Sequence, residues 1–234
     1  MSTGSQPRLH PLPLVVGIVA ALLYCNFLID WVLRGFEGMG EIVSELESPG
    51  EPNAMLLRVT DVVCAVLVVV LVVWARALLP RGAWREVFTW STVLFAIGAA
   101  LAAIVPEPCG PGVPCDAPHQ VLQRDVHGYA SVASDTALFL GVFAVIVVTW
   151  RVGPAWLRRV GWVVLVLGGL VSSLAFGYYH RYPDPDWAVG ASQRIHIAFI
   201  AAWIFCLGLF SARAEPPSAP ETSPAPAHDR TMTR

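Results

Sequence analysis

The chain has 234 residues, of which 56% are hydrophobic and only 14% are charged, against about 25% charged residues in an ordinary soluble domain. Its 15 basic residues, all arginine, and its 17 acidic residues are too few to cover the surface of a water-soluble protein of this length. The net charge of −2 argues against nucleic acid as a partner. Since a membrane-spanning helix takes about 20 apolar residues, the composition predicts a polytopic membrane protein with about six spans.

Six continuously apolar runs are long enough to cross a membrane as helices. None alternates apolar and polar residues as a barrel strand would, so we predict an all-α membrane helix bundle with six transmembrane helices. The first run has no small-residue cleavage site before Asp30, which favours a retained helix over a signal peptide. Residues 1–10 form a short N-terminus, 11–213 the transmembrane domain, and 214–234 a Pro-, Ala- and Ser-rich tail that is expected to be disordered. The spans are expected at about 11–33, 57–79, 86–105, 126–150, 160–179 and 193–212.

The distribution of arginine predicts the orientation. Arginines gather in the links after the second and fourth spans, whereas the links after the first and third spans are acidic. The positive-inside rule places the arginine-rich links in the cytoplasm, and both termini with them. Arg213, just after the last span, agrees with this N-in, C-in topology. The arginines of the two cytoplasmic links are Arg76, Arg81, Arg85, Arg151, Arg158 and Arg159.

The two outward loops carry a cysteine pair and a group of glutamates. Cys109 and Cys115 lie in EPCGPGVPC, on the side where oxidation persists, and a local disulfide is expected, with a pair of metal thiolates as the alternative. Cys25, Cys64 and Cys206 fall inside spans and are expected to be small apolar filler. The five glutamates of the first loop are expected to form a solvated acidic surface, with cation capture as the alternative. They are Glu37, Glu41, Glu45, Glu47 and Glu51.

Ionisable residues inside the spans concentrate in their outward halves. A charge within a span costs about 2.5 to 3.5 kcal/mol on insertion scales, so such residues normally face the bundle interior and find partners there. Five of the six spans contribute to this layer, which makes it the candidate ligand-binding site. Its members are Asp30, Asp61, His127, Asp135, His180, Arg194 and His196.

Within this layer, His127, Ser131 and Asp135 follow one another at four-residue spacing and therefore lie on one stripe of a helix. An imidazole, a hydroxyl and a carboxylate on one stripe suit catalysis, metal binding, a proton relay or a lipid-headgroup site. The structural alternative is an interhelical network in which Asp135 pairs with Arg194 and the histidine bonds to a carbonyl. Arg194 is structural if it neutralises Asp61 or Asp135, and it suits a lipid phosphate if it is unpaired in an outward cavity.

Short motifs in the chain resemble a known family. The stretch SELESPGEPNA, residues 44–54, resembles the SEL-x-x-x-G-x-P-x-A pattern of the DUF998 family of six-span prokaryotic membrane proteins. His127 after a Pro-rich loop and the pair Gln193-Arg194 at the start of the last span also fit this family. The resemblance covers about 11–212 and departs from the family after the third span, where VPEPCGPGVPCDAPHQ replaces a short FPTDP-like segment. It implies a multi-pass protein of the prokaryotic plasma membrane and no particular activity, because the family's function is unassigned.

Three functions are compatible with this pattern. The first is a non-enzymatic protein whose outward layer binds a lipid headgroup, a small solute or a partner, since no H-E-x-x-H or G-x-S-x-G signature occurs. The second is a metal-dependent intramembrane lipid hydrolase or transferase with His127, His180 and His196 as metal ligands and Asp135 activating water. The third is an ion- or proton-coupled transporter that uses Asp61 and Asp135, although no internal repeat is visible. The sequence identifies no cofactor, and membrane lipids are the expected partners.

Overall fold

In the computed structural model, which describes residues 10–151 and 153–213, the apolar runs of the sequence form helices, and this part of the chain contains no strand. The prediction of an all-α membrane helix bundle is confirmed. The predicted disordered tail and all but one residue of the short N-terminus lie outside the described residues. The elements are α1 (Pro11–Tyr24), α2 (Phe27–Leu33), the 3₁₀-helix η1 (Glu45–Glu47), α3 (Ala54–Leu78), α4 (Ala83–Ile104), α5 (Pro118–Val148), α6 (Ala155–Val163), the π-helix η2 (Val164–Val171), α7 (Ser172–Arg181) and α8 (Trp187–Ala212).

Five helices of the described chain are long and apolar enough to cross a membrane: α3, α4, α5, α8 and the continuous helix formed by α6, η2 and α7. With 14 residues, α1 is only about 21 Å long at 1.5 Å per residue. That is shorter than the hydrocarbon core of about 30 Å. It completes a sixth span only together with α2, and the two are bent by 55°. The first predicted span, 11–33, is therefore broken rather than straight.

The bend between α1 and α2 is fixed by a polar side chain. Asn26 is buried at the break, and its amide donates to α3. The acceptors are the Leu57 carbonyl at 3.1 Å, Thr60 Oγ1 at 3.1 Å and Asp61 Oδ1 at 2.8 Å. A buried amide without such acceptors is costly, so these bonds hold the chain in its bent path.

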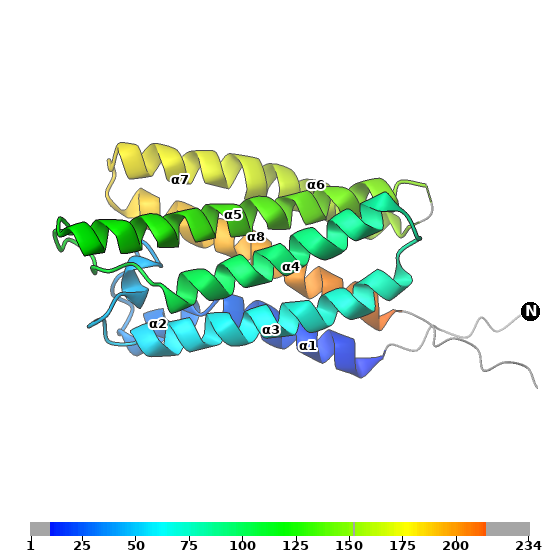
Figure 1. The fold of residues 1–234 in the computed structure, drawn as a ribbon, viewed down its shortest axis with the longest axis horizontal. Coiled ribbons are helices and arrows are strands. Elements are labelled where there is room, and N and C mark those ends of the chain that lie inside the picture. The colour runs from blue at the N-terminus through cyan, green and yellow to red at the C-terminus, as the bar shows by residue number, and fades with distance from the viewer. Residues whose placement is uncertain (1–9, 152, 214–234) are drawn as a thin grey trace, which may run out of the picture.

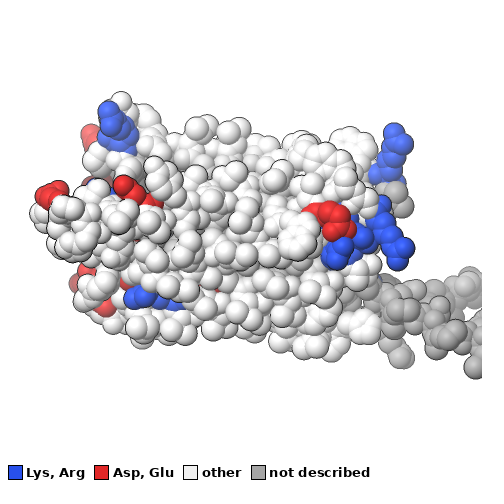
Figure 2. Space-filling view, viewed as in Figure 1, with Lys and Arg blue, Asp and Glu red and all other residues white. Residues whose placement is uncertain are grey.

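Two kinds of link close the bundle at its opposite ends (Figure 1). The links 34–53, 105–117 and 182–186 lie at one end, which we call the disulfide end. The links after α3 and α5 lie at the other, which we call the arginine end, and His10 N donates there to the Ala212 carbonyl at 2.8 Å. On the face drawn in Figure 2, charged side chains occupy the two ends and an uncharged belt separates them. Such a belt fits a lipid bilayer, and the chain is a multi-pass membrane protein.

Small residues bring the helices together where their backbones meet. A Cβ placed on Gly17 of α1 would lie 2.7 Å from the Cα of Gly208 in α8. One placed on Gly98 of α4 would lie 2.8 Å from the Cβ of Ser134 in α5. In a membrane, where burial of apolar surface does not drive helices together, such close contacts are a main source of association. These residues therefore hold the pairs α1–α8 and α4–α5.

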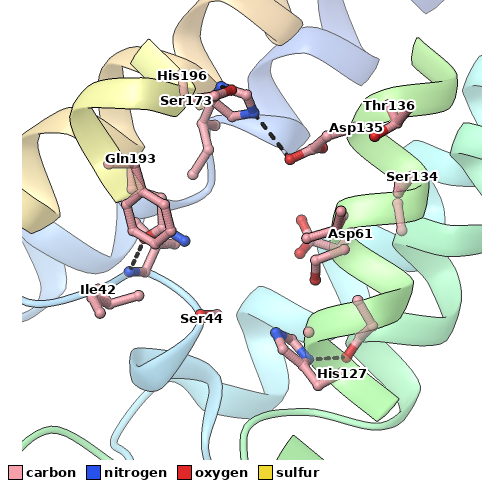
Figure 3. Close-up of a pocket in the computed structure, with 18 of the residues that line it drawn as sticks. Ile42, Ser44, Asp61, His127, Ser134, Asp135, Thr136, Ser173, Gln193 and His196 are labelled. Atoms are coloured by element: carbon pink, nitrogen blue, oxygen red, sulfur yellow. Dashed lines mark hydrogen bonds and ion pairs between the residues drawn. The ribbon is translucent and has the colours of Figure 1, made fainter. Parts of the chain in front are cut away.

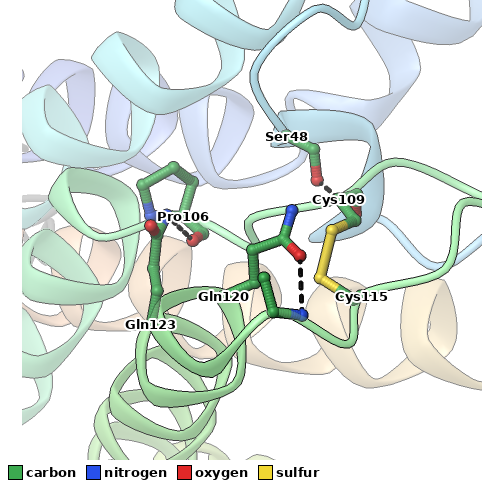
Figure 4. The surroundings of a disulfide bond; sticks show 7 residues. Ser48, Pro106, Cys109, Cys115, Gln120 and Gln123 are labelled. Carbon is green, nitrogen blue, oxygen red and sulfur yellow. Dashed lines mark hydrogen bonds between the residues drawn. A yellow bond between two sulfur atoms is a disulfide. The ribbon is translucent and has the colours of Figure 1, made fainter.

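The predicted disulfide between Cys109 and Cys115 closes the loop after α4 (Figure 4). Ser48 Oγ donates to the Cys109 carbonyl at 2.7 Å and so joins this loop to the one after α2. Gln123 Nε2 donates to the Pro106 carbonyl at 2.9 Å from the first turns of α5. As predicted for apolar filler, Cys64 and Cys206 are buried within their helices. Cys25, for which the same was predicted, is only partly buried and lies at the break between α1 and α2.

Replacing both disulfide cysteines by serine is expected to lower stability moderately. The bond joins residues six positions apart, and closing so short a loop contributes about 2 kcal/mol in the chain-entropy model. Thermal unfolding of the purified Cys109→Ser/Cys115→Ser protein should show a lower Tm than the parent, with helical content retained. Reductant should bring the parent to the variant's Tm and leave the variant unchanged. A variant as stable as the untreated parent would contradict this prediction.

Candidate functional site

A cavity of about 1370 Å³ occupies the half of the bundle next to the disulfide end (Figure 3). Its walls come from α3, α4, α5, α8, the π-helix η2 and α7, from the end of α1 with Asn26 after it, and from loop residues 42–45 and 47. Ser131 lines this cavity together with five of the seven residues of the predicted polar layer. These five are Asp61, His127, Asp135, His180 and His196. The other two, Asp30 and Arg194, are not among the lining residues.

His196 joins three helices at the cavity wall. Its Nε2 lies 3.0 Å from Asp135 Oδ2 on α5, and its Nδ1 lies 2.9 Å from the Gly168 carbonyl on η2 (Figure 3). Because both ring nitrogens face acceptors, the doubly protonated imidazolium fits this position. The predicted pairing of Asp135 with Arg194 is wrong, since His196 is the partner of Asp135. The π-helix that supplies the carbonyl is a local irregularity of the kind that often marks functional sites.

The imidazole ring of His127 is held in place through its Nδ1 atom. Nδ1 lies 3.0 Å from the carbonyls of both Ala102 and Val105, at the end of α4. This bonding agrees with the predicted alternative in which the histidine bonds to a carbonyl. With the proton on Nδ1, Nε2 is a hydrogen-bond acceptor. The ring is only 5% exposed, and Nε2 points into the cavity without a hydrogen-bond partner among the described residues (Figure 3).

The loop after α2 places Glu47 against Asp61. Glu47 is 5% exposed, and its carboxyl group is hydrogen-bonded to that of Asp61. Such a bond needs a proton on one of the two groups. Burial raises the pKa of Glu47 to about 7, although the bond to Asp61 and the charge of Arg58 act in the opposite direction. A solvated position, expected for all five glutamates of this loop, is therefore wrong for Glu47, because Leu46 beside it packs inward and carries η1 into the bundle.

Arg194 holds the same loop from α8. Its Nη1 donates to the Glu41 carbonyl at 2.6 Å and its Nη2 to the Gly38 carbonyl at 2.9 Å. The neighbouring Gln193 accepts a hydrogen bond from the Val43 N–H. Arg194 thus neither neutralises Asp61 or Asp135 nor faces the cavity as a phosphate ligand, the two uses considered from the sequence. The Gln-Arg pair instead fixes the loop that carries Glu47.

Asp30 also has a structural role at the disulfide end. Both of its oxygens accept from Arg34 Nε at 2.9 Å, and Oδ1 accepts from Asn53 at 2.8 Å. Arg34 in turn donates to Glu51 at 2.9 Å. This network joins the end of α2 to the start of α3. It explains why Asp30, although buried in a span, does not take part in the cavity.

The predicted three-histidine metal site is not assembled in the described part of the chain. No three side chains of His, Cys, Asp or Glu come together there to hold a metal ion. His180 is exposed and stacks on Phe176, with ring centroids 5.8 Å apart. His127 and His196 each direct Nδ1 to backbone carbonyls. The three histidines share a cavity but not a coordination sphere.

Several charged residues of the cavity were missed by sequence reasoning. Arg124 and Asp125 line it because α5 begins at Pro118, two turns before the predicted start of that span at Val126. Burial also raises the pKa of Glu45 and of Glu107. Acidic side chains therefore outnumber basic ones around the cavity. The acids are Glu45, Glu47, Asp61, Glu107, Asp125 and Asp135, and the bases are Arg124 and the three histidines.

Comparison with known proteins identifies the family of the chain. Neither the curated proteins nor the solved structures contain a match to it. The family model described as "Protein of unknown function (DUF998)" matches residues 15–209, from within α1 to within α8. This match covers the bundle and every cavity residue described above, so the chain belongs to the DUF998 family.

Proposed function

We propose that the protein binds an amphipathic ligand, with its polar head in the cavity and its apolar part between α5 and the π-helix η2. The observation that carries this proposal is the combination of polar and apolar walls. Hydrophobic side chains that line the cavity are also exposed, which marks its open side: Val132 is 65% exposed, Leu170 58% and Val166 42%. An opening of this kind gives an apolar chain a path from the bilayer into the cavity.

The packing of the helices supports such an opening. α5 packs mainly against α4, whereas η2 and α7 pack more against α8 than against α5, so the two sides of the opening belong to different helix pairs. The volume of about 1370 Å³ exceeds the range of about 300 to 1,000 Å³ that is usual for pockets of drug-sized molecules. It has room for a head group together with part of a chain. Membrane lipids are the nearest source of such molecules.

Photolabelling in a reconstituted membrane tests this proposal. The protein is placed in vesicles that contain a phospholipid with a diazirine in its acyl chain, and the labelled peptides are identified by mass spectrometry. Labels are expected on α5 around Val132 and on η2 around Leu170, in addition to the outer faces of the bundle. Val132→Trp fills the opening and should reduce labelling of η2 several-fold.

A matched variant separates this effect from a general change in lipid contact. Val66 on α3 is 60% exposed and does not line the cavity, so Val66→Trp should leave labelling of η2 unchanged. Equal labelling of η2 in the parent and in both variants would show that the cavity takes up no chain. That outcome would contradict the proposed function.

A further inference from the structure

We infer that the head group of the ligand is an ammonium group with N–H donors, and that it binds at Asp61, Glu47 and His127 in exchange for the proton shared by the two carboxyl groups. The inference rests on the proposed function and names the chemistry of its ligand. Three observations support it. The two carboxyl groups have no cationic partner, the three side chains can all accept hydrogen bonds, and the carboxyl groups are negatively charged once the proton has left.

Glu47 is the buried acid of the described chain that has no cationic partner, and Asp61 beside it has none either. Asp30 is paired with Arg34, and Asp135 with His196. Within the described residues, no basic group lies within salt-bridge distance of Asp61 or Glu47. A buried carboxylate without a counter-ion is costly, which explains why this pair retains a proton.

The nearest arginine is engaged elsewhere. Arg58 lies less than one turn before Asp61 on α3, but its Nε donates to the Ala103 carbonyl at 2.7 Å and its Nη2 to the Ile104 carbonyl at 3.3 Å. These bonds tie α3 to the end of α4. Because no basic side chain of the described residues pairs with the two carboxyl groups, a bound cation or a proton can supply their countercharge.

A third acceptor faces the same space. His127 Nε2 points into the cavity, unpartnered among the described residues, on a ring that is 95% buried, and Figure 3 places it across from Asp61. Two carboxyl groups and an unprotonated imidazole nitrogen all accept hydrogen bonds. A primary ammonium group has three N–H donors and a positive charge, and so matches them. A phosphate group does not match this site, because its oxygens are hydrogen-bond acceptors and would face further acceptors. A quaternary ammonium group does not match it either, because it has no N–H to donate to His127.

The exchange balances charge and protons. The empty pair holds one proton and a net charge of −1; when R–NH₃⁺ binds, the proton leaves to solvent, and the two carboxylates with the ammonium group again total −1. Since burial raises the pKa of Glu47 to about 7, the ammonium group must displace a proton when it binds below that pH. Affinity should therefore rise with pH, by up to tenfold per pH unit, between pH 5.5 and about 7.

Other titratable or charged groups surround this pair in the cavity and on the helices packed against it. They are Tyr24, Glu45, Arg58, Cys64, Glu107, Arg124, Asp125, His127, Asp135, His180 and His196.

Calorimetric titration with two matched amphiphiles tests the inference. The full protein, in nanodiscs of phosphatidylcholine, is titrated with decylamine and with decyltrimethylammonium, which have the same chain length and charge, and empty nanodiscs provide the baseline. Decylamine should bind at least tenfold more tightly at pH 7.5, and its Kd should increase at lower pH. Proton release, measured by repeating the titration in buffers of different ionisation enthalpy, should approach one per ligand below pH 7.

Amide variants test the residues without emptying the site. Glu47→Gln keeps a hydrogen-bond donor toward Asp61 but has no proton to release, so decylamine should bind at least tenfold more weakly and without dependence on pH. Asp61→Asn, which retains the oxygen that accepts from Asn26, should have a similar effect. Asp116→Asn, at an exposed acid that does not line the cavity, should change neither affinity nor pH dependence.

The outcomes separate the inference from the proposed function. If the diazirine phospholipid labels the cavity wall but the two decyl compounds bind equally, the ammonium inference fails and the proposed function stands. If the wall is not labelled at all and neither compound binds, both fail. Adding phosphatidylethanolamine to the nanodiscs identifies the source of the amine. If phosphatidylethanolamine competes with decylamine, the amine belongs to a lipid headgroup. If decylamine binds tightly and phosphatidylethanolamine does not compete, the ligand is an amine without a phosphate group.

Discussion

Replacing Arg194 by methionine is expected to destabilise the protein by about 3 to 5 kcal/mol. The side chain is 6% exposed and makes two charge-assisted hydrogen bonds to loop carbonyls. Each such bond contributes about 1.5 to 3 kcal/mol, and the carbonyls of Gly38 and Glu41 would lose their partner. Chemical unfolding of the purified protein in detergent measures the loss, and limited proteolysis should show new cleavage in the loop between α2 and α3.

Two variants control for this prediction. Arg194→Lys keeps the charge but not the forked geometry, and should fall between the parent and the methionine variant. Arg213→Met makes the same change at an exposed arginine just after the same helix, where the guanidinium group lies over the ring of Trp156, and should cost little. Similar losses for Arg194→Met and Arg213→Met would contradict a structural role for the first arginine.

The same mutation, glycine to alanine, is expected to have opposite effects at Gly208 and Gly177. A Cβ on Gly208 would lie 2.6 Å from the Cα of Gly17 and 2.9 Å from the Pro13 carbonyl, both backbone atoms of α1. Because backbone atoms cannot easily move aside, Gly208→Ala should lower the free energy of unfolding by about 3 kcal/mol, the upper end of the range for overpacking. Gly177 in α7 has open space around its Cβ position, and Gly177→Ala should stabilise its helix by about 0.5 to 1 kcal/mol.

Thermal unfolding of the two variants beside the parent measures both effects. The Tm of Gly208→Ala should fall and that of Gly177→Ala should rise. A Tm for Gly208→Ala equal to that of the parent would mean that α1 and α8 can move apart freely. The close contact of these helices would then contribute little to the stability of the bundle.

The sequence predicted the helices because each run of apolar residues is long enough to span a bilayer, and this property does not depend on tertiary contacts. It also predicted the depth of the polar layer, since a residue's position along a helix fixes its height in the bundle. Asp61, His127 and Asp135, which were predicted at a similar depth, line one cavity in the structure. The disulfide between Cys109 and Cys115 was predictable because the two cysteines are only six positions apart in a Pro- and Gly-rich loop.

The pairing of side chains could not be predicted, because it depends on how each helix is rotated and on which helix stands beside it. His196 rather than Arg194 faces Asp135, although the two are only two positions apart on α8. The burial of Glu47 depends on the path of a loop whose composition is that of an exposed segment. The bend at Asn26 depends on acceptors in α3, more than 30 positions later.

The π-helix η2 has a consequence for the whole second half of its span. Each π turn takes in one more residue than an α turn, so the residues after η2 are rotated about the helix axis relative to an uninterrupted α-helix. Ser173, Phe176 and His180 face the cavity with this rotation included. Removing one residue from η2 to restore regular α-helix would turn all three together by about 100°. The π-helix thus determines which face of α7 is turned toward the cavity, and the make-up of the cavity wall depends on the number of residues in η2.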